Sequence, residues 1–200
     1  MASVTDRICL DRNSAAELQG LREDGTRHLL PDLAYKRLFL VNVAFYGNPD
    51  AYENWVLIDT GVPGTLANLK DAARRRFGGR APSAIVLTHA HPDHIGCLSG
   101  LSALWDVPVY AHRLEHPYIT GDSGYPSPDP GAGGGLLSRA ALARELKPLD
   151  DSGRLHDLPP DGSVPCMPGW RWLPTPGHSA GHVSLWREAD RTLLAGDALL

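Results

Sequence analysis

Apolar runs separated by polar turns predict an alternation of strands and helices along most of the chain. Strands are predicted at Leu38 to Phe45 and at Trp55 to Ile58, with the turn Gly47 to Asp50 between them. From Leu66 to Phe77 the apolar residues recur at the spacing of one helical face, which predicts a helix. The wholly apolar run Ala84 to Leu87 is typical of a strand that is covered on both faces.

The same alternation continues toward the end of the chain. A helix is predicted at Ile95 to Trp105, and strands are predicted at Val107 to Ala111, Trp170 to Leu173, His182 to Trp186 and Thr192 to Ala195. Four prolines and six glycines between Pro117 and Gly135 predict an irregular loop, and a weaker pattern predicts a helix at Ser138 to Leu146. Residues 1–34 give no clear element. Strands and helices in alternation predict an α/β fold.

Composition narrows the class of protein. The chain has 200 residues, of which 42% are hydrophobic, and this is enough for one packed domain, residues 1–200. Its net charge of −4 gives no basic surface for nucleic acid or an anionic membrane, and no apolar run is long enough to span a bilayer. The cysteines Cys9, Cys97 and Cys166 form no CxxC pair, which favours a reducing compartment, the cytoplasm, over a disulfide framework.

The string Thr88-His-Ala-His-Pro-Asp-His94 carries the strongest chemical signal. It follows the buried strand directly and holds four side chains that can bind a metal ion. His89 and His91 are two residues apart, so in an extended chain they lie on the same side, and Asp93 and His94 follow where the chain turns. This spacing predicts two neighbouring ligand clusters for zinc or iron.

Two later strings add ligands. His178 lies in the Gly/Pro-bounded turn Thr175 to His182, and Asp197 ends the following strand. Strand ends are where active sites of open α/β sheets gather. We expect His178 to complete a three-histidine site with His89 and His91, and Asp197 to bridge to a second metal.

These strings together resemble the metallo-β-lactamase-fold hydrolase superfamily. The HxHxDH string at His89 to His94, the TPGHSAGH string around His178, the Gly-Asp at Asp197 and the Asp-Thr-Gly turn at Asp59 occur in that family's order. The resemblance implies a four-layer αββα sandwich with a dinuclear metal centre at one rim. It implies that the first metal binds His89, His91 and His178, that the second binds Asp93 and His94, and that Asp197 bridges them.

The resemblance also implies a further histidine downstream of Asp197, followed by a closing strand and helix. The chain ends at Leu200, so we expect the sandwich to lack these last elements. An alternative function follows from this: a truncated or partner-requiring member of the fold that is catalytically silent.

The expected activity is hydrolysis by a metal-bound hydroxide, because coordination lowers the pKa of water to about 7. Asp93 would act as the catalytic residue that orients the nucleophile and passes a proton to the leaving group. The substrate would be a small ester, lactone or thioester, including a glutathione thioester. The cofactor would be one or two Zn²⁺ ions, with iron or manganese left open, and a one-iron persulfide dioxygenase is a further alternative. Nucleases are disfavoured by the acidic charge, and a homo-oligomer is left open.

Five further positions have expected supporting roles. Asp59 and His182 would lie behind the ligands and orient them by hydrogen bonds. His112 ends a predicted strand, and Tyr118 and Tyr125 belong to the Gly/Pro loop. We expect these three side chains to contact the substrate.

Overall fold

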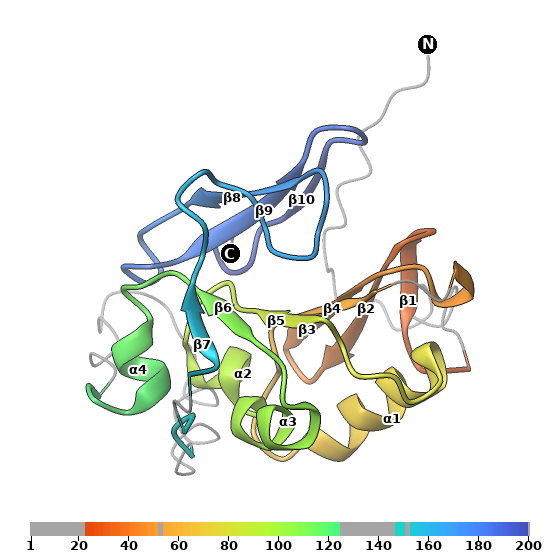
Figure 1. The fold of residues 1–200 in the computed structure, drawn as a ribbon, viewed down its shortest axis with the longest axis horizontal. Coiled ribbons are helices and arrows are strands. Elements are labelled where there is room, and N and C mark those ends of the chain that lie inside the picture. Colours follow the sequence, from red (N-terminus) through yellow and green to blue (C-terminus); the bar gives the residue numbers. More distant parts are fainter. Residues whose placement is uncertain (1–22, 52–53, 125–146, 151–152, 200) are drawn as a thin grey trace.

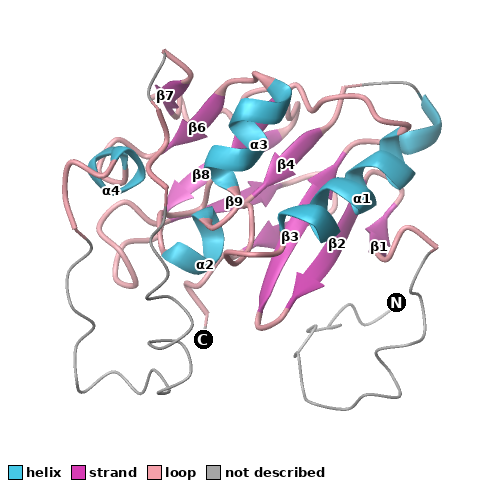
Figure 2. Ribbon diagram, turned by 90° about the horizontal axis from the view of Figure 1, so that it is seen from below, coloured by secondary structure: helices cyan, strands magenta, loops and turns pink. Residues whose placement is uncertain are grey.

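Two β-sheets lie one above the other, with helices on one side of the larger sheet (Figures 1 and 2). The computed structural model describes residues 23–51, 54–124, 147–150 and 153–199. The larger sheet has the order β1-β2-β3-β4-β5-β6-β7, with strands Arg27–Leu30, Leu33–Leu38, Val41–Tyr46, Val56–Ile58, Ala84–Val86, Val109–Ala111 and Leu155–Asp157. The smaller sheet has the order β10-β9-β8, with β8 Trp170–Pro174, β9 Val183–Arg187 and β10 Thr192–Leu194.

The helices pack on the face of the larger sheet that points away from the smaller one (Figure 1). They are α1 Leu66–Phe77, α2 Pro92–Ile95, α3 Leu98–Trp105 and α4 His116–Thr120, and a short 3₁₀ turn spans Pro49–Ala51. The described residues thus form three layers of the expected αββα sandwich: helices, large sheet and small sheet. None of the described helices is long and apolar enough to cross a membrane.

The central strands are apolar on both faces because each face supports a separate core. Leu57 of β4 and Ile85 of β5 point toward the helices and pack in the cluster that includes Leu69 and Phe77 of α1. Their neighbours Val56, Ile58, Ala84 and Val86 point toward the small sheet and pack with Trp170, Val183 and Leu185. Alternate residues of a strand point to opposite faces, so a strand between two layers reads as a continuous apolar run.

The direction of the strands brings the candidate site residues to one rim of the sheet. β1 to β4 pair antiparallel, whereas β4, β5, β6 and β7 pair parallel. The carboxyl ends of parallel strands meet at the same edge, and here Asp59 follows β4, Thr88 follows β5 soon after its end, and His112 follows β6. The small sheet joins this rim, because the Val183 N–H donates to the Thr88 carbonyl at 2.9 Å.

The structure corrects the first predicted strand. The strand expected at Leu38 to Phe45 is the end of β2, a turn at Phe39 and Leu40, and most of β3. Phe39 has a φ of 59° and both turn side chains are 76% exposed, so an apolar pair forms a turn that polar residues usually form. β1 and the first two residues of β2 lie in the segment, residues 1–34, that gave no clear element.

The helix expected at Ile95 to Trp105 is divided between α2 and α3. The break lies at Gly96, whose N–H donates to the Gly61 carbonyl at 2.8 Å instead of continuing a helix. A Cβ at this position would lie 2.3 Å from the backbone nitrogen of Pro63. The close passage of the Gly61 turn therefore requires glycine here and interrupts the helix.

The Gly/Pro segment is also more regular at its start than predicted. α4 covers His116–Thr120, with Pro117 in its first turn, where a missing N–H has no cost. The strand β7 gave no recognised pattern. The rest of that segment from residue 125, and the helix predicted at Ser138 to Leu146, lie outside the described residues.

Candidate metal centre

Two loops from different sheets meet at the rim and carry the candidate ligands. We call residues 88–94, after β5, the first ligand loop, and residues 175–182, between β8 and β9, the second ligand loop. Asp197 reaches the same place from the end of β10. The donor atoms form two sets, and within each set they lie within 4.8 Å of one another: His89, His91 and His178 form one, and His89, His94 and Asp197 form the other.

The three-histidine set has ring nitrogens that face one another. His91 Nδ1 lies 2.7 Å from His178 Nε2. The Nε2 of the fully buried His89 has no hydrogen-bond partner among the described residues. A buried ring nitrogen without a partner is costly unless something binds it, and neutral imidazole nitrogens are good zinc ligands. The residues therefore fit a metal ion.

The three histidines differ in exposure, and this leaves the site open to solvent on one side. His89 is buried, His91 is half-buried and His178 is exposed. An ion between these three nitrogens would thus face solvent beside His178, where a substrate can approach.

Asp59 orients two of the candidate ligands from behind. Its carboxylate accepts the Thr88 N–H and the Thr88 hydroxyl, both at 2.8 Å, and lies 2.9 Å from Nδ1 of His94. The Thr88 hydroxyl lies 3.0 Å from Nδ1 of His89. Because the hydroxyl proton goes to Asp59, the Thr88 oxygen accepts from Nδ1 of His89. Both histidines consequently present Nε2 to the site.

Asp59 adopts a φ of 60° while 3% exposed. This left-handed conformation is uncommon for a residue with a side chain. The hydrogen bonds to Thr88 and His94 hold it in place.

Asp197, a member of the second donor set, lies between His94 and His178. Its Oδ1 is 3.3 Å from Nε2 of His94, and its Oδ2 is 3.4 Å from Nε2 of His178. Each carboxylate oxygen therefore faces one histidine, an arrangement that suits a bridging ligand.

His182 supports Asp197 from behind. Its Nε2 accepts the Asp197 N–H at 3.0 Å, so its proton resides on Nδ1, which donates to Thr175 Oγ1 at 2.8 Å. Thr175 in turn contacts Ser184 Oγ, which donates to the Ala195 carbonyl. Both ring nitrogens of His182 are thus engaged, and the structure leaves neither for a metal.

The local electrostatics keep most of these histidines neutral. Burial, together with the neighbouring histidines, lowers the pKa of His91 to about 4 and lowers that of His89 further. Burial also lowers the pKa of His182. For His94 burial acts in the same direction, but Asp59 and Asp197 outweigh it and raise the pKa to about 10. A cation at Nε2 of His94 would occupy the position that these carboxylates favour for a positive charge.

The pKa values of the carboxylates of Asp197 and Asp93 are shifted in opposite directions. Burial tends to raise the pKa of Asp197, but the hydrogen bond and charge of His94 and the charge of His178 lower it below the usual value. Burial raises the pKa of Asp93, with His94 opposing the shift. Asp93 is half-buried in the first turn of α2 and belongs to neither donor set.

The expected substrate contacts fall in different surroundings. The His112 ring lies 5.8 Å from that of Trp172, and its Nδ1 lies beside Gly181 of the second ligand loop. Tyr118 lies on α4 and packs against the helix-side core. Tyr125 lies outside the described residues.

Sequence reasoning missed Glu115, which directly precedes α4. Its buried carboxylate accepts hydrogen bonds from Ala90 in the first ligand loop and from Ser179 and Gly181 in the second. The available signal was its place shortly after a buried strand at the rim. Nothing in the local pattern around Glu115 indicates these partners.

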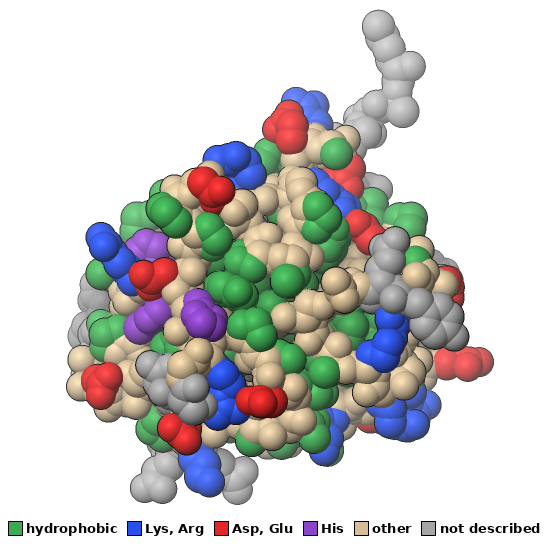
Figure 3. All heavy atoms as spheres, viewed as in Figure 1, with side chains coloured by type: hydrophobic (Ala, Val, Ile, Leu, Met, Phe, Trp, Pro, Cys, Tyr) green, Lys and Arg blue, Asp and Glu red, His purple; other side chains and the backbone are tan. Residues whose placement is uncertain are grey.

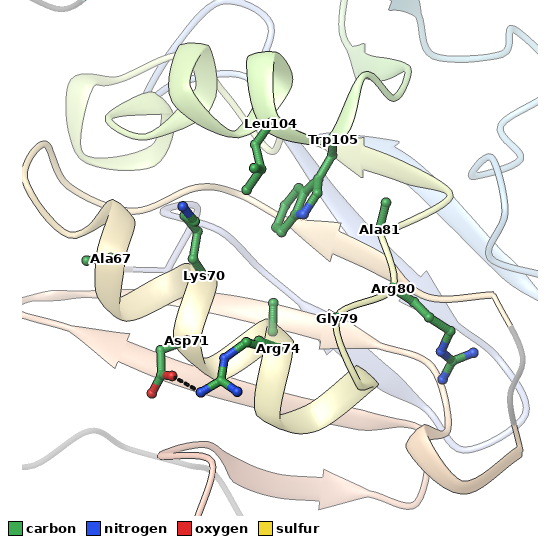
Figure 4. A pocket seen from close by; sticks show the side chains of 10 residues that line it. Ala67, Lys70, Asp71, Arg74, Gly79, Arg80, Ala81, Leu104 and Trp105 are labelled. Carbon is green, nitrogen blue, oxygen red and sulfur yellow. Dashed lines mark hydrogen bonds and ion pairs between the residues drawn. The ribbon is translucent and has the colours of Figure 1, made fainter.

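A separate hollow of about 580 Å³ lies on the helical face between α1 and α3 (Figure 4). Its lining includes Lys70, Arg74, Arg80, Leu104 and Trp105. None of the candidate ligands belongs to it, so this hollow is distinct from the metal centre.

Comparison with known proteins agrees with the geometry. The probable metallo-hydrolase YflN of Bacillus subtilis (strain 168) is 42% identical over 162 residues, which are 80% of this chain and 61% of that protein. The hydroxyacylglutathione hydrolase of Bdellovibrio bacteriovorus is 27% identical over 81% of this chain and 50% of that protein. The chain thus spans between half and two thirds of the length of these relatives.

The fold has counterparts among solved structures. Rm3 metallo-beta-lactamase superposes with a TM-score of 0.61 at 22% identity, over 79% of this chain and 54% of that one. The family model of the metallo-beta-lactamase superfamily matches residues 38–200, which include both ligand loops and Asp197. The chain belongs to the metallo-beta-lactamase superfamily.

Proposed function

We propose that this protein is a metal-dependent hydrolase of small ester-like substrates. The observation that carries the proposal is the presence at one rim of two donor sets that share His89, each with its donor atoms within 4.8 Å of one another. Two relatives, one named a probable metallo-hydrolase and the other a hydroxyacylglutathione hydrolase, support the reaction class.

The proposed centre holds two Zn²⁺ ions. His89, His91 and His178 would bind the first ion, His94 and Asp93 the second, and Asp197 would bridge them. Four carboxylates, those of Asp59, Asp93, Glu115 and Asp197, lie in or beside this centre, and this negative charge favours a second cation. The ligand types would also accept iron or manganese.

Zinc in such a site lowers the pKa of a bound water to about 7 and polarises a carbonyl oxygen. The chain's own residues position the ligands and transfer the proton. Asp59 and His182 hold the ligands and Asp197 in position through the hydrogen bonds described above. Asp93 lies in the first turn of α2, next to His94, where a carboxylate could orient the nucleophile and pass a proton to the leaving group, and we propose Asp93 as this catalytic residue.

The proposed substrate is a small ester, lactone or thioester. It would approach beside the exposed His178, with His112, Tyr118 and Tyr125 as contacts. A nucleic-acid substrate is disfavoured by the net charge of −4 and by the mixture of positive and negative side chains on the face shown in Figure 3. We place the protein in the cytoplasm, a reducing compartment, because Cys97 and Cys166 are unbonded.

Metal analysis and a substrate panel test the proposal together. The purified protein should contain zinc, and added Zn²⁺ should raise turnover of at least one substrate among lactones, thioesters and aryl esters. His91→Ala should abolish that turnover, because it removes one of three ligands of the first ion. Protein that binds no zinc, iron or manganese would refute the metal centre. Protein that binds metal but turns over nothing favours the alternative, a catalytically silent member of the fold.

A further inference from the structure

Glu115 joins the two loops that carry the candidate ligands. It is fully buried, and it precedes α4 in the connection from β6 (Figure 1). Its Oε2 accepts the Ala90 N–H at 2.9 Å. Its Oε1 accepts both the Ser179 hydroxyl and the Gly181 N–H at 2.7 Å.

These contacts lie next to the ligands themselves. Ala90 stands between His89 and His91, and Ser179 follows His178 directly. One rigid carboxylate therefore spans the two segments whose ring nitrogens approach to 2.7 Å. A change in its length or hydrogen bonding would alter the separation of these nitrogens.

The packing around this carboxylate leaves little freedom. A Cβ at Gly181 would lie 2.8 Å from both Cγ and Oε1 of Glu115 and 2.9 Å from Nδ1 of His112. The second ligand loop thus passes against Glu115 at a distance that only glycine permits. Side chain and loop fix each other's position.

The chemistry requires a carboxylate rather than an amide. Three donors point at two oxygens, and an ionised carboxylate is acceptor-only. Hydrogen bonds to a charged acceptor are also stronger than neutral ones, which offsets the cost of burying the charge. A glutamine in this place would direct an NH₂ group at the donors of one loop or the other.

We propose that Glu115 is a positioning residue that sets the distance between the two ligand loops and so determines the affinity of the three-histidine site. This inference rests on the metal centre of the proposed function and adds to it a residue outside both donor sets. Glu115 acts through Ala90, Ser179 and Gly181, without touching the ion.

Binding of Co²⁺ to the purified full chain tests this role, because its visible absorption reports the geometry of the ligands. Affinity is measured by competition with a chromophoric chelator. Glu115→Gln should weaken Co²⁺ binding about 10–100-fold and change the spectrum, as loss of a residue that orients metal ligands does. Ser179→Ala removes one of the three donors and should produce a smaller loss in the same direction.

Asp32→Asn is the matched control for stability. Asp32 pairs with Arg187 at the end of β9 that lies away from Val183 and the ligand loops. This variant should lower the melting temperature and leave Co²⁺ affinity and spectrum unchanged.

Each result decides a separate point. Wild-type protein that binds no Co²⁺ would overturn the metal centre and this inference with it. If wild type binds and Glu115→Gln stays within about twofold of it with the same spectrum, the inference alone is wrong. An equal loss in Asp32→Asn would assign the effect to global stability and also overturn it. Should Glu115→Gln fail to fold, an unchanged Ser179→Ala would refute the role.

Discussion

Asp59→Asn should separate metal binding from folding, because it preserves the shape of the side chain and reverses two of its hydrogen bonds. The amide oxygen can still accept the Thr88 N–H, which lies 2.8 Å from Oδ1. The amide nitrogen replaces Oδ2, which accepts the Thr88 hydroxyl at 2.8 Å and lies 2.9 Å from Nδ1 of His94. An amide nitrogen donates, so both contacts must change direction.

The reversal moves protons on two ligands. If the Thr88 hydroxyl accepts from the amide, its own proton goes to Nδ1 of His89, and the ring proton of His89 then resides on Nε2. His94 likewise becomes an acceptor at Nδ1 and carries its proton on Nε2. Both rings then present an N–H to the site where a metal needs a lone pair.

The two measurable effects differ in size. The protein keeps a hydrogen bond at each contact but loses the charge of the acceptor, so its free energy of unfolding should fall by only about 1–2 kcal/mol. Affinity for Zn²⁺ should fall about 10–100-fold, or about 1.4–2.7 kcal/mol. Chelator competition measures the affinity and urea unfolding without added metal measures the stability.

Asp106→Asn is a matched control for this change. Asp106 also has a positive φ, 52°, but its exposed side chain pairs with Arg154 at the end of α3. The control should leave Zn²⁺ affinity unaltered. Equal Zn²⁺ affinities of Asp59→Asn and wild type would refute the assigned proton positions.

Two further substitutions test how the site is supported. Arg187 makes paired contacts with Asp32 across the sheets and with Asp190, and its guanidinium lies 4.8 Å from the Trp170 ring. Arg187→Leu leaves both carboxylates without this partner; because they are partly exposed, the free energy of unfolding should fall by only about 2–3 kcal/mol. A urea midpoint equal to that of wild type would contradict this. Gly196 has a φ of 56°, and a Cβ there would lie 2.7 Å from Nε2 of His182. Gly196→Ala should therefore lower the free energy of unfolding by about 2 kcal/mol and weaken Zn²⁺ binding through Asp197. An unchanged melting temperature would show that the turn adapts freely.

The candidate ligands could be predicted because their signal is local. His89, His91, Asp93 and His94 lie within one short string, and the apolar run before them marks the buried strand that ends there. His178 and Asp197 were found by their positions in turns beside predicted strands. The structure brings five of these six into two donor sets, while Asp93 remains a proposal.

The rest could not be predicted because its determinants are distant or atypical. The partners of Glu115 lie 25, 64 and 66 residues away along the chain, and no spacing rule reaches so far. The turn between β2 and β3 consists of Phe39 and Leu40, which are the residue types of a strand. Likewise, the break between α2 and α3 depends on the approach of Gly61 to Gly96, which only the folded chain shows.

The order of the strands gives a common physical origin to the two buried carboxylates. β5, which delivers the first ligand loop, lies between β4 and β6 in the sheet, and all three run parallel. Asp59 follows β4 and holds the loop at Thr88 and His94; Glu115 follows β6 and holds it at Ala90. The loop between them is therefore fixed from both sides by acceptors on rigid elements. Since parallel neighbours end at one edge, an acidic residue shortly after each strand flanking a histidine-bearing strand is a signal that can be sought in sequence, provided the strand order is known.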